Sequence, residues 1–181
     1  MLYTALEKIG RFSADELAFI EQHLVRKPFR KNDILLAEGV VCQSASFLVS
    51  GVAYQFSMND IEENIIDLYL TNDWVINYQS FVGQRPSTTE IKAYSDGELL
   101  EMSIYTVHYL IETSPVFFQL GKLLEQAIAR NHYFDNALTP LQKYTHLLET
   151  RPQLLQQFPL KMIASYLKIT PETLSRVRSM Y

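Results

Sequence analysis

The chain has 181 residues, of which 48% are apolar and 20% charged, a composition that suits one large or two small globular domains. No apolar run approaches the roughly 20 residues that a membrane span needs, which excludes an integral helical membrane protein. Neither a signal-peptide pattern nor a second cysteine accompanies Cys42, so we expect a cytoplasmic protein in which this thiol is buried and structural.

The net charge of −4 is unevenly distributed. Residues 139–181 carry six basic and two acidic side chains, whereas residues 1–138 carry ten basic and eighteen acidic ones. A basic segment on an acidic body favours a nucleic acid that binds at one end of the molecule only.

The first two thirds of the chain predict a short helix followed by many short strands. A capping box at residues 13–16 opens an amphipathic helix that reaches Val25. From Pro28 to Ser103, β-branched and aromatic runs alternate with turn signals, which is typical of an antiparallel sandwich or barrel. The predicted strands cover residues 34–36, 47–49, 52–56, 65–70, 91–94 and 99–104. This region contains no phosphate-binding glycine loop and no nucleophile elbow.

A long helix is predicted from Ser114-Pro115 to Thr139-Pro140. Apolar residues recur in it at alternating intervals of three and four, with one polar member, which is the pattern of a coiled-coil seam. The seam residues are Phe117, Leu120, Leu124, Ala127, Asn131, Phe134 and Leu138. The stripe could pack on the chain's own sheet or on a second copy. We favour a homodimer, because the stripe is longer than one small barrel should cover.

The last residues, 160–181, predict a helix-turn-helix preceded by another helix over residues 141–150. Ile163, Ala164 and Leu167 share one face of the first helix, and Leu174 and Val177 share one face of the second. Two helices with these faces pack at a steep angle, and the second can enter a DNA major groove. A surface helix pair with a charged face is the alternative.

The second of these helices has a defined start and an exposed polar face. Thr170 is a suitable N-cap, and Pro171 suits the first helical position. Glu172, Ser175 and Arg176 then point outward together, and Arg matches guanine while Glu accepts from cytosine. We expect these three residues to read bases. The expected phosphate contacts are Lys161, Lys168, Thr170, Thr173 and Arg178.

A β-roll, a long helix and a C-terminal helix-turn-helix, in this order, resemble the Crp/Fnr family of bacterial transcription regulators. The markers are Glu38-Gly39, residues 49–52, residues 72–74, Ser114-Pro115 and residues 169–176. The resemblance implies an α+β chain with a cyclic-nucleotide-binding-like, jelly-roll-like β-roll at 1–113, a dimerisation helix at 114–138 and a winged helix-turn-helix domain at 139–181. It implies a homodimer on palindromic double-stranded DNA, with RNA polymerase as a candidate partner and no cofactor.

The chain departs from the relatives that bind cyclic AMP. Where these hold the nucleotide with Gly-Glu and Arg-Ser pairs, the matching positions are Ile76-Asn77 and Ser87-Thr88, and Arg85 lies two residues away. We therefore expect that cyclic AMP is not the effector. The positions that would line an effector pocket are Trp74, Ile76, Asn77, Tyr78, Arg85, Ser87 and Thr88. Their aromatic members, with Phe81, favour a flatter and more apolar molecule, and a roll that works without a ligand is equally open.

Other departures concern the oxygen-sensing cysteine cluster, the turn and the wing. The cluster is absent, since Cys42 is alone. Lys168 stands where the family's turn has glycine, so a positive φ there would cost about 1 kcal/mol. Because the sequence ends at Tyr181, we expect the β-wing to be minimal or missing.

Two further function classes compete with DNA reading. One is a small-molecule-binding roll that signals through a protein partner, with a weak or vestigial DNA-binding end. The other is a metal-dependent enzyme, which needs clustered ligands. The histidines are scattered over the predicted helices and their flanks without metal-ligand spacing: His23, His108, His132 and His146. We therefore expect no metal site and no enzyme.

Overall fold

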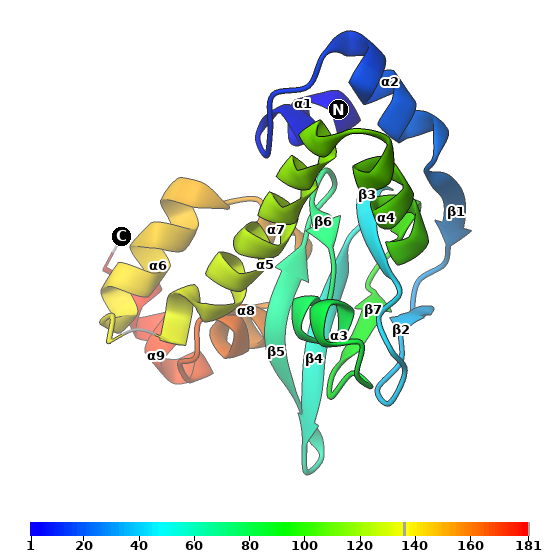
Figure 1. Cartoon of the computed structure of the whole chain (residues 1–181). Helices are drawn as coiled ribbons and strands as arrows, with labels where there is room; N and C mark the ends of the chain where they lie inside the picture. Colours follow the sequence, from blue (N-terminus) through cyan, green and yellow to red (C-terminus); the bar gives the residue numbers. More distant parts are fainter. Residues whose placement is uncertain (136, 181) are drawn as a thin grey trace.

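The computed structural model describes residues 1–135 and 137–180, and its centre is a roll of two four-stranded antiparallel sheets (Figure 1). The first sheet has the order β1 (Val25–Phe29), β8 (Gly97–Ser103), β3 (Ser44–Ser50) and β6 (Trp74–Val75). The second has the order β2 (Ile34–Leu36), β7 (Glu90–Ala93), β4 (Ala53–Asn59) and β5 (Glu62–Tyr69). The antiparallel roll and all six predicted strands are confirmed.

Strands β1 and β6 were not predicted. β1 carries Arg26, Lys27 and Pro28 and lies at a sheet edge, where proline and charged residues are tolerated. Its basic side chains pair with acidic ones of β8, with 2.6 Å between Lys27 Nζ and Glu101 Oε1. β6 has only two residues and shows no periodicity.

Side chains from both sheets fill the roll interior. Leu48 of β3, Ala53 of β4, Tyr69 of β5 and Ala93 of β7 are all fully buried there. Such alternation places every second residue of a strand inside and leaves the next one for the outer face. The two outer faces of the roll are then covered by two different sets of helices.

The first outer face is covered by α1 (Leu2–Glu7), α2 (Ala14–Gln22) and α4 (Ile104–Thr113), which share a core with β3 and β8. The capping box is confirmed: the Glu16 N–H donates to Ser13 Oγ over 3.3 Å and the Ser13 N–H donates to Glu16 Oε2 over 2.6 Å. A further short helix, α3 (Tyr78–Gly83), follows β6. Among the described residues, no helix combines the length and apolarity that crossing a bilayer requires.

The long helix begins at Pro115 as expected, but the described residues 137–139 are not helical, so the expected end at Leu138 is wrong, and the segment is not one uniform α-helix. It consists of η1 (Pro115–Gly121), α5 (Lys122–His132) and η2 (Tyr133–Asp135), in which η marks 3-10 turns. The α-helical part has 11 residues and therefore spans about 17 Å. Asn136, within the predicted helix, lies outside the described residues.

The predicted seam packs mainly on its own chain, which corrects the assignment of its residues to a dimer contact. Phe117, Leu120 and Ala127 are buried in the core of the first outer face, and Phe134 is buried against the C-terminal helices. Leu124, Asn131 and Leu138 are only partly buried. The exposed apolar side chains of this segment are instead Phe118 and Ile128, 65% and 43% exposed.

The second outer face is covered by α6 (Pro140–Thr150), α7 (Leu154–Gln157), α8 (Leu160–Tyr166) and α9 (Pro171–Arg178). Figure 1 shows these helices beside β5, with the C-terminus away from the roll. Ile65 and Leu68 of β5 share one buried cluster with Ile163 and Leu174. The division at residues 113 and 138 stays a prediction, and the C-terminal helices share a core with the roll.

Candidate nucleic-acid interface

The N-terminus of α9 is built as the residue types predicted. The Thr170 hydroxyl accepts a hydrogen bond from the Thr173 N–H over 3.2 Å, and Pro171 occupies the first turn, where its missing N–H costs nothing. Leu174 and Val177 are buried against the neighbouring helices. The helix is therefore fixed at its start and along one face, which determines what the other face presents.

The outward face of α9 carries the three residues expected to read bases. Glu172, Ser175 and Arg176 are all exposed, and none of them is used by the core. The backbone N–H of Glu172 and the Thr170 hydroxyl hold the pKa of the Glu172 carboxyl below its ordinary value, so it stays ionised at neutral pH. Arg176 Nη2 lies 3.3 Å from Thr173 Oγ1, a weak contact that leaves most guanidinium donors free.

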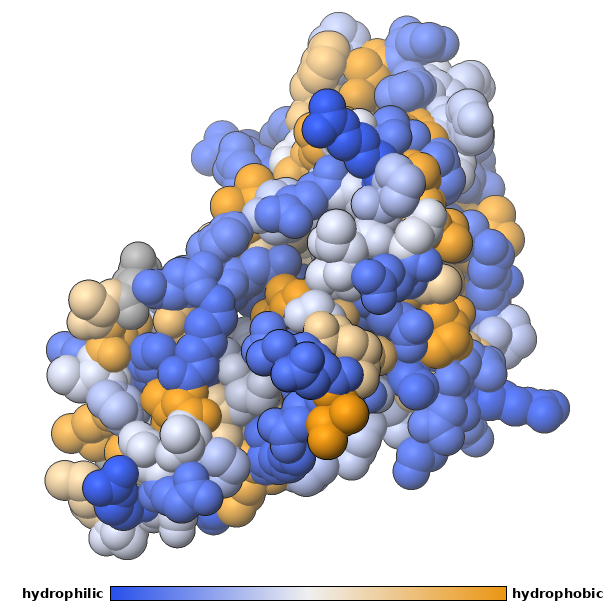
Figure 2. Space-filling model, turned by 90° about the horizontal axis from the view of Figure 1, so that it is seen from below, coloured by the Kyte–Doolittle hydropathy of each residue, from blue (hydrophilic) through white to orange (hydrophobic). Residues whose placement is uncertain are grey.

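Hydrophilic side chains predominate on the underside of the molecule (Figure 2). Apolar side chains are scattered over this side rather than gathered in one patch (Figure 2). Such a surface suits a charged, hydrated partner better than an apolar one. Arg178 is exposed on α9, and Thr173 is partly buried beside the cap.

The turn between α8 and α9 is strained at Lys168, as the missing glycine suggested. Its φ is +55°, in the left-handed region that non-glycine residues enter at a cost of about 1 kcal/mol or more. The Lys168 N–H still donates to Ser165 O over 2.9 Å, which closes the end of α8. The fold therefore retains a long cationic side chain at a position that favours glycine.

Both lysines expected to contact phosphate are paired with carboxylates of the same chain. Lys161 Nζ lies 3.0 Å from Glu62 Oε1 on β5, and Lys168 pairs with Asp135 of η2. Ser165 adds a contact, because its hydroxyl accepts the Ile65 N–H over 2.9 Å. The sequence did not reveal these partners.

A groove of about 980 Å³ runs between the β4–β5 hairpin and the helix-turn-helix. One wall carries Lys161, Lys168 and Thr170, three of the expected phosphate contacts. The other carries Glu62 and Glu63. The cations that would meet DNA thus face an acidic hairpin across this groove.

The expected effector residues are only partly brought together. Asn77, Tyr78 and Thr88 line a groove of about 300 Å³ between the roll and η2, together with Asn131 and other residues. Trp74, Ile76, Arg85 and Ser87 do not line it. Trp74 packs on Phe47 in the core of the first outer face, with ring centroids 5.5 Å apart. The prediction that Trp74 lines an effector pocket is therefore wrong.

At Asn77 and Ser87, two of the positions that match the nucleotide-binding pairs of the relatives, other side chains of the roll already take up the hydrogen-bonding groups. Asn77 Nδ2 donates to Ser87 Oγ over 2.8 Å and to Thr89 Oγ1 over 2.9 Å. Ser87 in turn donates to the Thr89 carbonyl over 2.6 Å, and Gln55 Nε2 donates to Thr89 Oγ1 over 2.8 Å. These four residues are buried, and they satisfy one another without an arginine. Arg85, the alternative arginine, is exposed.

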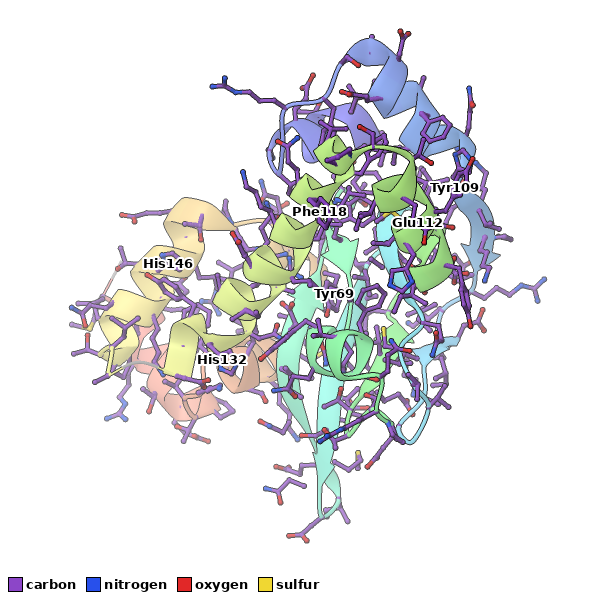
Figure 3. All side chains as sticks on the ribbon, in the orientation of Figure 1. Tyr69, Tyr109, Glu112, Phe118, His132 and His146 are labelled. Atoms are coloured by element: carbon purple, nitrogen blue, oxygen red, sulfur yellow. The ribbon has the colours of Figure 1, made fainter. Side chains whose placement is uncertain are left out.

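A polar chain connects this groove to the turn of the helix-turn-helix. The Tyr78 hydroxyl lies 2.6 Å from His132 Nε2, and His132 Nδ1 lies 2.7 Å from Asp135 Oδ2. Asp135 then pairs with Lys168. Figure 3 shows His132 at the lower end of α5, beside the C-terminal helices. Among the described residues, no three potential metal ligands gather into a site.

Comparison with known structures decides the fold. A catabolite activator protein from Thermus thermophilus is 17% identical, with 97% of this chain and 85% of that one aligned at a TM-score of 0.61. FixK2 from Bradyrhizobium japonicum is 16% identical over 87% of this chain and 83% of its own, at a TM-score of 0.67. The chain has the Crp/Fnr fold.

A third structure with this fold is CLP of Xanthomonas campestris, described as a global regulator responsive to c-di-GMP. CLP is 16% identical over 93% of this chain and 91% of its own, at a TM-score of 0.62. No protein-family model and no curated protein matches the sequence. At these identities the likeness extends to the fold alone, and one fold hosts many functions.

Proposed function

We propose that this chain is a homodimeric, sequence-specific DNA-binding transcription regulator of the Crp/Fnr type. The observation that carries the proposal is the exposed face of α9, where Glu172, Ser175 and Arg176 project from a helix capped by Thr170 and anchored by its apolar side. Arg and Glu side chains at these spacings suit guanine and cytosine edges in the major groove. Lys161, Lys168 and Arg178 supply the sequence-independent attraction to phosphates.

The dimer that we propose uses the exposed side of the long helical segment. Phe118, Glu125 and Ile128 lie at helical spacing on this side, and Phe118 is the most exposed apolar member. Figure 3 shows Phe118 towards the upper end of the segment that carries His132 lower down. Two copies that meet here by twofold symmetry would bring two α9 helices to a palindromic site.

We also propose that cyclic AMP is not the effector. A cyclic phosphate needs a charge-assisted partner, and Ser87 offers a neutral hydroxyl that already donates to the Thr89 carbonyl. Losing such a partner costs about 2–5 kcal/mol, which moves a micromolar affinity towards the millimolar range. Titration calorimetry with cyclic AMP at about 100 μM should show no saturable heat. Saturable binding would mean that Arg85 reorients to take the phosphate.

The function itself is tested by selecting bound fragments from a pool of random duplex DNA. An enriched palindrome with two half-sites is expected for a dimeric reader. The alternative function, a small-molecule-binding roll that signals through a protein, draws support from the pairing of Lys161 and Lys168 within the chain. This alternative would be favoured if the selection enriches no DNA sequence while the protein remains a dimer.

A further inference from the structure

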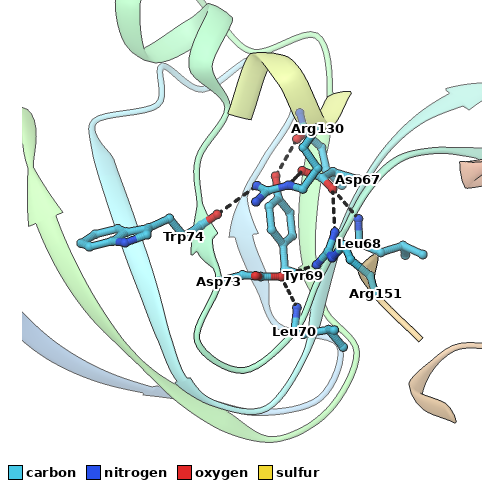
Figure 4. A network of polar contacts seen from close by, with 9 residues as sticks. Asp67, Leu68, Tyr69, Leu70, Asp73, Trp74, Arg130 and Arg151 are labelled. Carbon is cyan, nitrogen blue, oxygen red and sulfur yellow. Dashed lines mark hydrogen bonds and ion pairs between the residues drawn. The ribbon is translucent and has the colours of Figure 1, made fainter. Parts of the chain in front are cut away.

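A buried cluster of charges lies where the roll, the long helix and the C-terminal helices meet (Figure 4). Asp67 comes from β5 and its side chain is 0% exposed. Arg130 comes from α5, and Arg151 ends α6. Asp73 comes from the turn before β6. Four side chains from four parts of the chain therefore meet at one point.

The contacts within the cluster are directional. Arg130 Nε donates to Asp67 Oδ2 over 2.6 Å, and Arg130 Nη2 donates to the Trp74 carbonyl over 3.1 Å. Arg151 pairs with Asp73 through Nη2, and its Nη1 lies 3.9 Å from Asp67 Oδ1. Asp67 thus lies between two arginines, one from the long helix and one from the DNA-reading end (Figure 4).

The roll holds its side of the cluster in place. Asp67 Oδ1 accepts the Leu68 N–H over 2.9 Å, and Asp73 Oδ2 accepts the Leu70 N–H over 2.8 Å. The guanidinium of Arg130 stacks on the buried ring of Tyr69 at 5.0 Å. Burial alone would lower the pKa of Arg130, but Asp67 and Asp73 outweigh it and hold the pKa above its ordinary value. Both carboxylates are therefore held by the backbone of the roll through contacts that do not involve Arg151.

Arg151 is the one member contributed by the C-terminal helices, and its side chain is 18% exposed. The rest of the contact between these helices and β5 is largely apolar, and apolar packing is not directional. Charge-assisted hydrogen bonds are short and angle-dependent. A rotation of the helices on the roll that apolar packing would tolerate breaks the Arg151–Asp73 pair and leaves two partly buried charges without their ion-pair partner.

We propose that the pairing of Arg151 with Asp67 and Asp73 is a positioning contact that sets the orientation of α9 relative to the roll, and with it the half-site spacing that the dimer accepts. This proposal rests on the proposed DNA-reading function for its second half only. In a symmetric dimer, a rotation in each copy changes the separation of the two α9 helices, which has to match about 34 Å of DNA. Arg151 is thereby a positioning residue that touches no DNA.

The first test measures orientation without DNA. Spin labels on Glu112→Cys of α4 and Ser179→Cys after α9 report the distance between the helix packed on the roll and the end of α9, in samples diluted with unlabelled protein so that each pair lies within one copy. Cys42 is buried, and protein without the added cysteines gives the background signal. One narrow distance distribution is expected. Arg151→Met should broaden or shift it, and Arg151→Lys, which keeps a cation but loses the planar fork, should give an intermediate result.

The matched control is Arg26→Met, which removes an arginine from an ion pair with Glu98 on the other sheet. It should leave the distribution unchanged. Thermal melts of each variant confirm that it is folded, and the milder lysine variant keeps the test decisive if the methionine variant unfolds. A distribution in folded Arg151→Met and Arg151→Lys that equals the parent's would overturn the proposal.

The second test uses the DNA site selected by the parent protein, with its two half-sites moved apart or together by one base pair at a time. The parent should prefer one spacing. In Arg151→Met this preference should fall by about fivefold or more, the lower end of couplings between protein sites, while the base preference within each half-site is retained. An equal loss at every spacing would show a merely structural role. A parent that selects no sequence would refute the proposed function and leave the distance test standing.

Discussion

The ion pair between Lys161 and Glu62 predicts that the roll competes with DNA for a cation. Glu62→Gln removes the carboxylate charge while it keeps the size of the side chain. Lys161 Nζ lies 3.0 Å from Glu62 Oε1, and the two side chains are 73% and 69% exposed. Because the pair is solvated, it has the strength of a surface ion pair and not that of a buried one.

The expected gain in DNA affinity follows from this exposure. Two unit charges 3.0 Å apart attract by about 1.4 kcal/mol in pure water, before screening by salt. Measured surface pairs contribute about 0.2–1 kcal/mol, which corresponds to a factor of roughly 1.5 to 5 in a binding constant. We therefore expect Glu62→Gln to bind DNA about 1.5 to 5 times more tightly, because Lys161 no longer has to leave a partner.

Fluorescence anisotropy of a labelled duplex at a fixed salt concentration of about 0.1 M measures this gain. Glu63→Gln is the matched control, since it removes the same charge from the same hairpin and its carboxylate accepts from the Tyr54 hydroxyl rather than from a lysine. Glu62→Gln should exceed this control. In a Lys161→Ala background, Glu62→Gln and Glu63→Gln should change the DNA affinity by the same amount. Equal gains from both variants in the wild-type background would refute the competition between Glu62 and DNA.

Three other predictions address strain, assembly and pH. Lys168→Gly should raise the unfolding free energy by about 0.5 kcal/mol, since relief of roughly 1 kcal/mol of backbone strain at φ +55° exceeds the entropic cost of glycine. The same variant should lower the salt slope of DNA binding by about 0.9, because it removes one phosphate contact. A destabilised variant in thermal melts would show that the ion pair with Asp135 outweighs the strain. Ile128→Asp should sediment as a folded monomer, because this side chain is 43% exposed within one chain and a charge is costly only where the dimer would bury it. An intact dimer of this variant would show that this surface is not the dimer interface. Burial lowers the pKa of His146 in the folded chain, so as the pH falls this side chain binds a proton in the unfolded chain before it does in the folded one. The unfolding free energy should therefore decrease below about pH 6.5, and less so in His146→Gln, as denaturant titrations at several pH values would show. An identical pH dependence in the two proteins would exclude His146 as the cause.

The features that the sequence could predict are those decided locally. Alternation of two residues marked the strands, and the capping residues Ser13 and Thr170 marked the starts of α2 and α9. The exposed face of α9, which we propose reads bases, follows from the same logic, since the buried Leu174 and Val177 leave the opposite side exposed. Strands β1 and β6 were missed because one is charged at a sheet edge and the other is too short for a period.

The features that could not be predicted depend on contacts between distant parts of the chain. An apolar stripe looks the same whether it packs on a second copy or on its own roll, so the pattern could not assign Phe117 and Phe134 to the chain's own cores. Lys161 and Glu62 are 99 positions apart, and no local pattern joins them. The buried cluster did leave one signal: Asp67 interrupts the apolar run of residues 65–70, and a buried charge requires a partner.

Sequence reading by α9 is tested most directly by repeating the random-duplex selection with Arg176→Ala beside the parent protein. Arg176 is exposed, so its removal leaves the packing of Leu174 and Val177 intact. The two selected motifs should agree except at one G·C pair in each half-site, where the preference is lost at a cost of about 1–3 kcal/mol per contact. An unchanged motif for Arg176→Ala would contradict base reading by this face of α9.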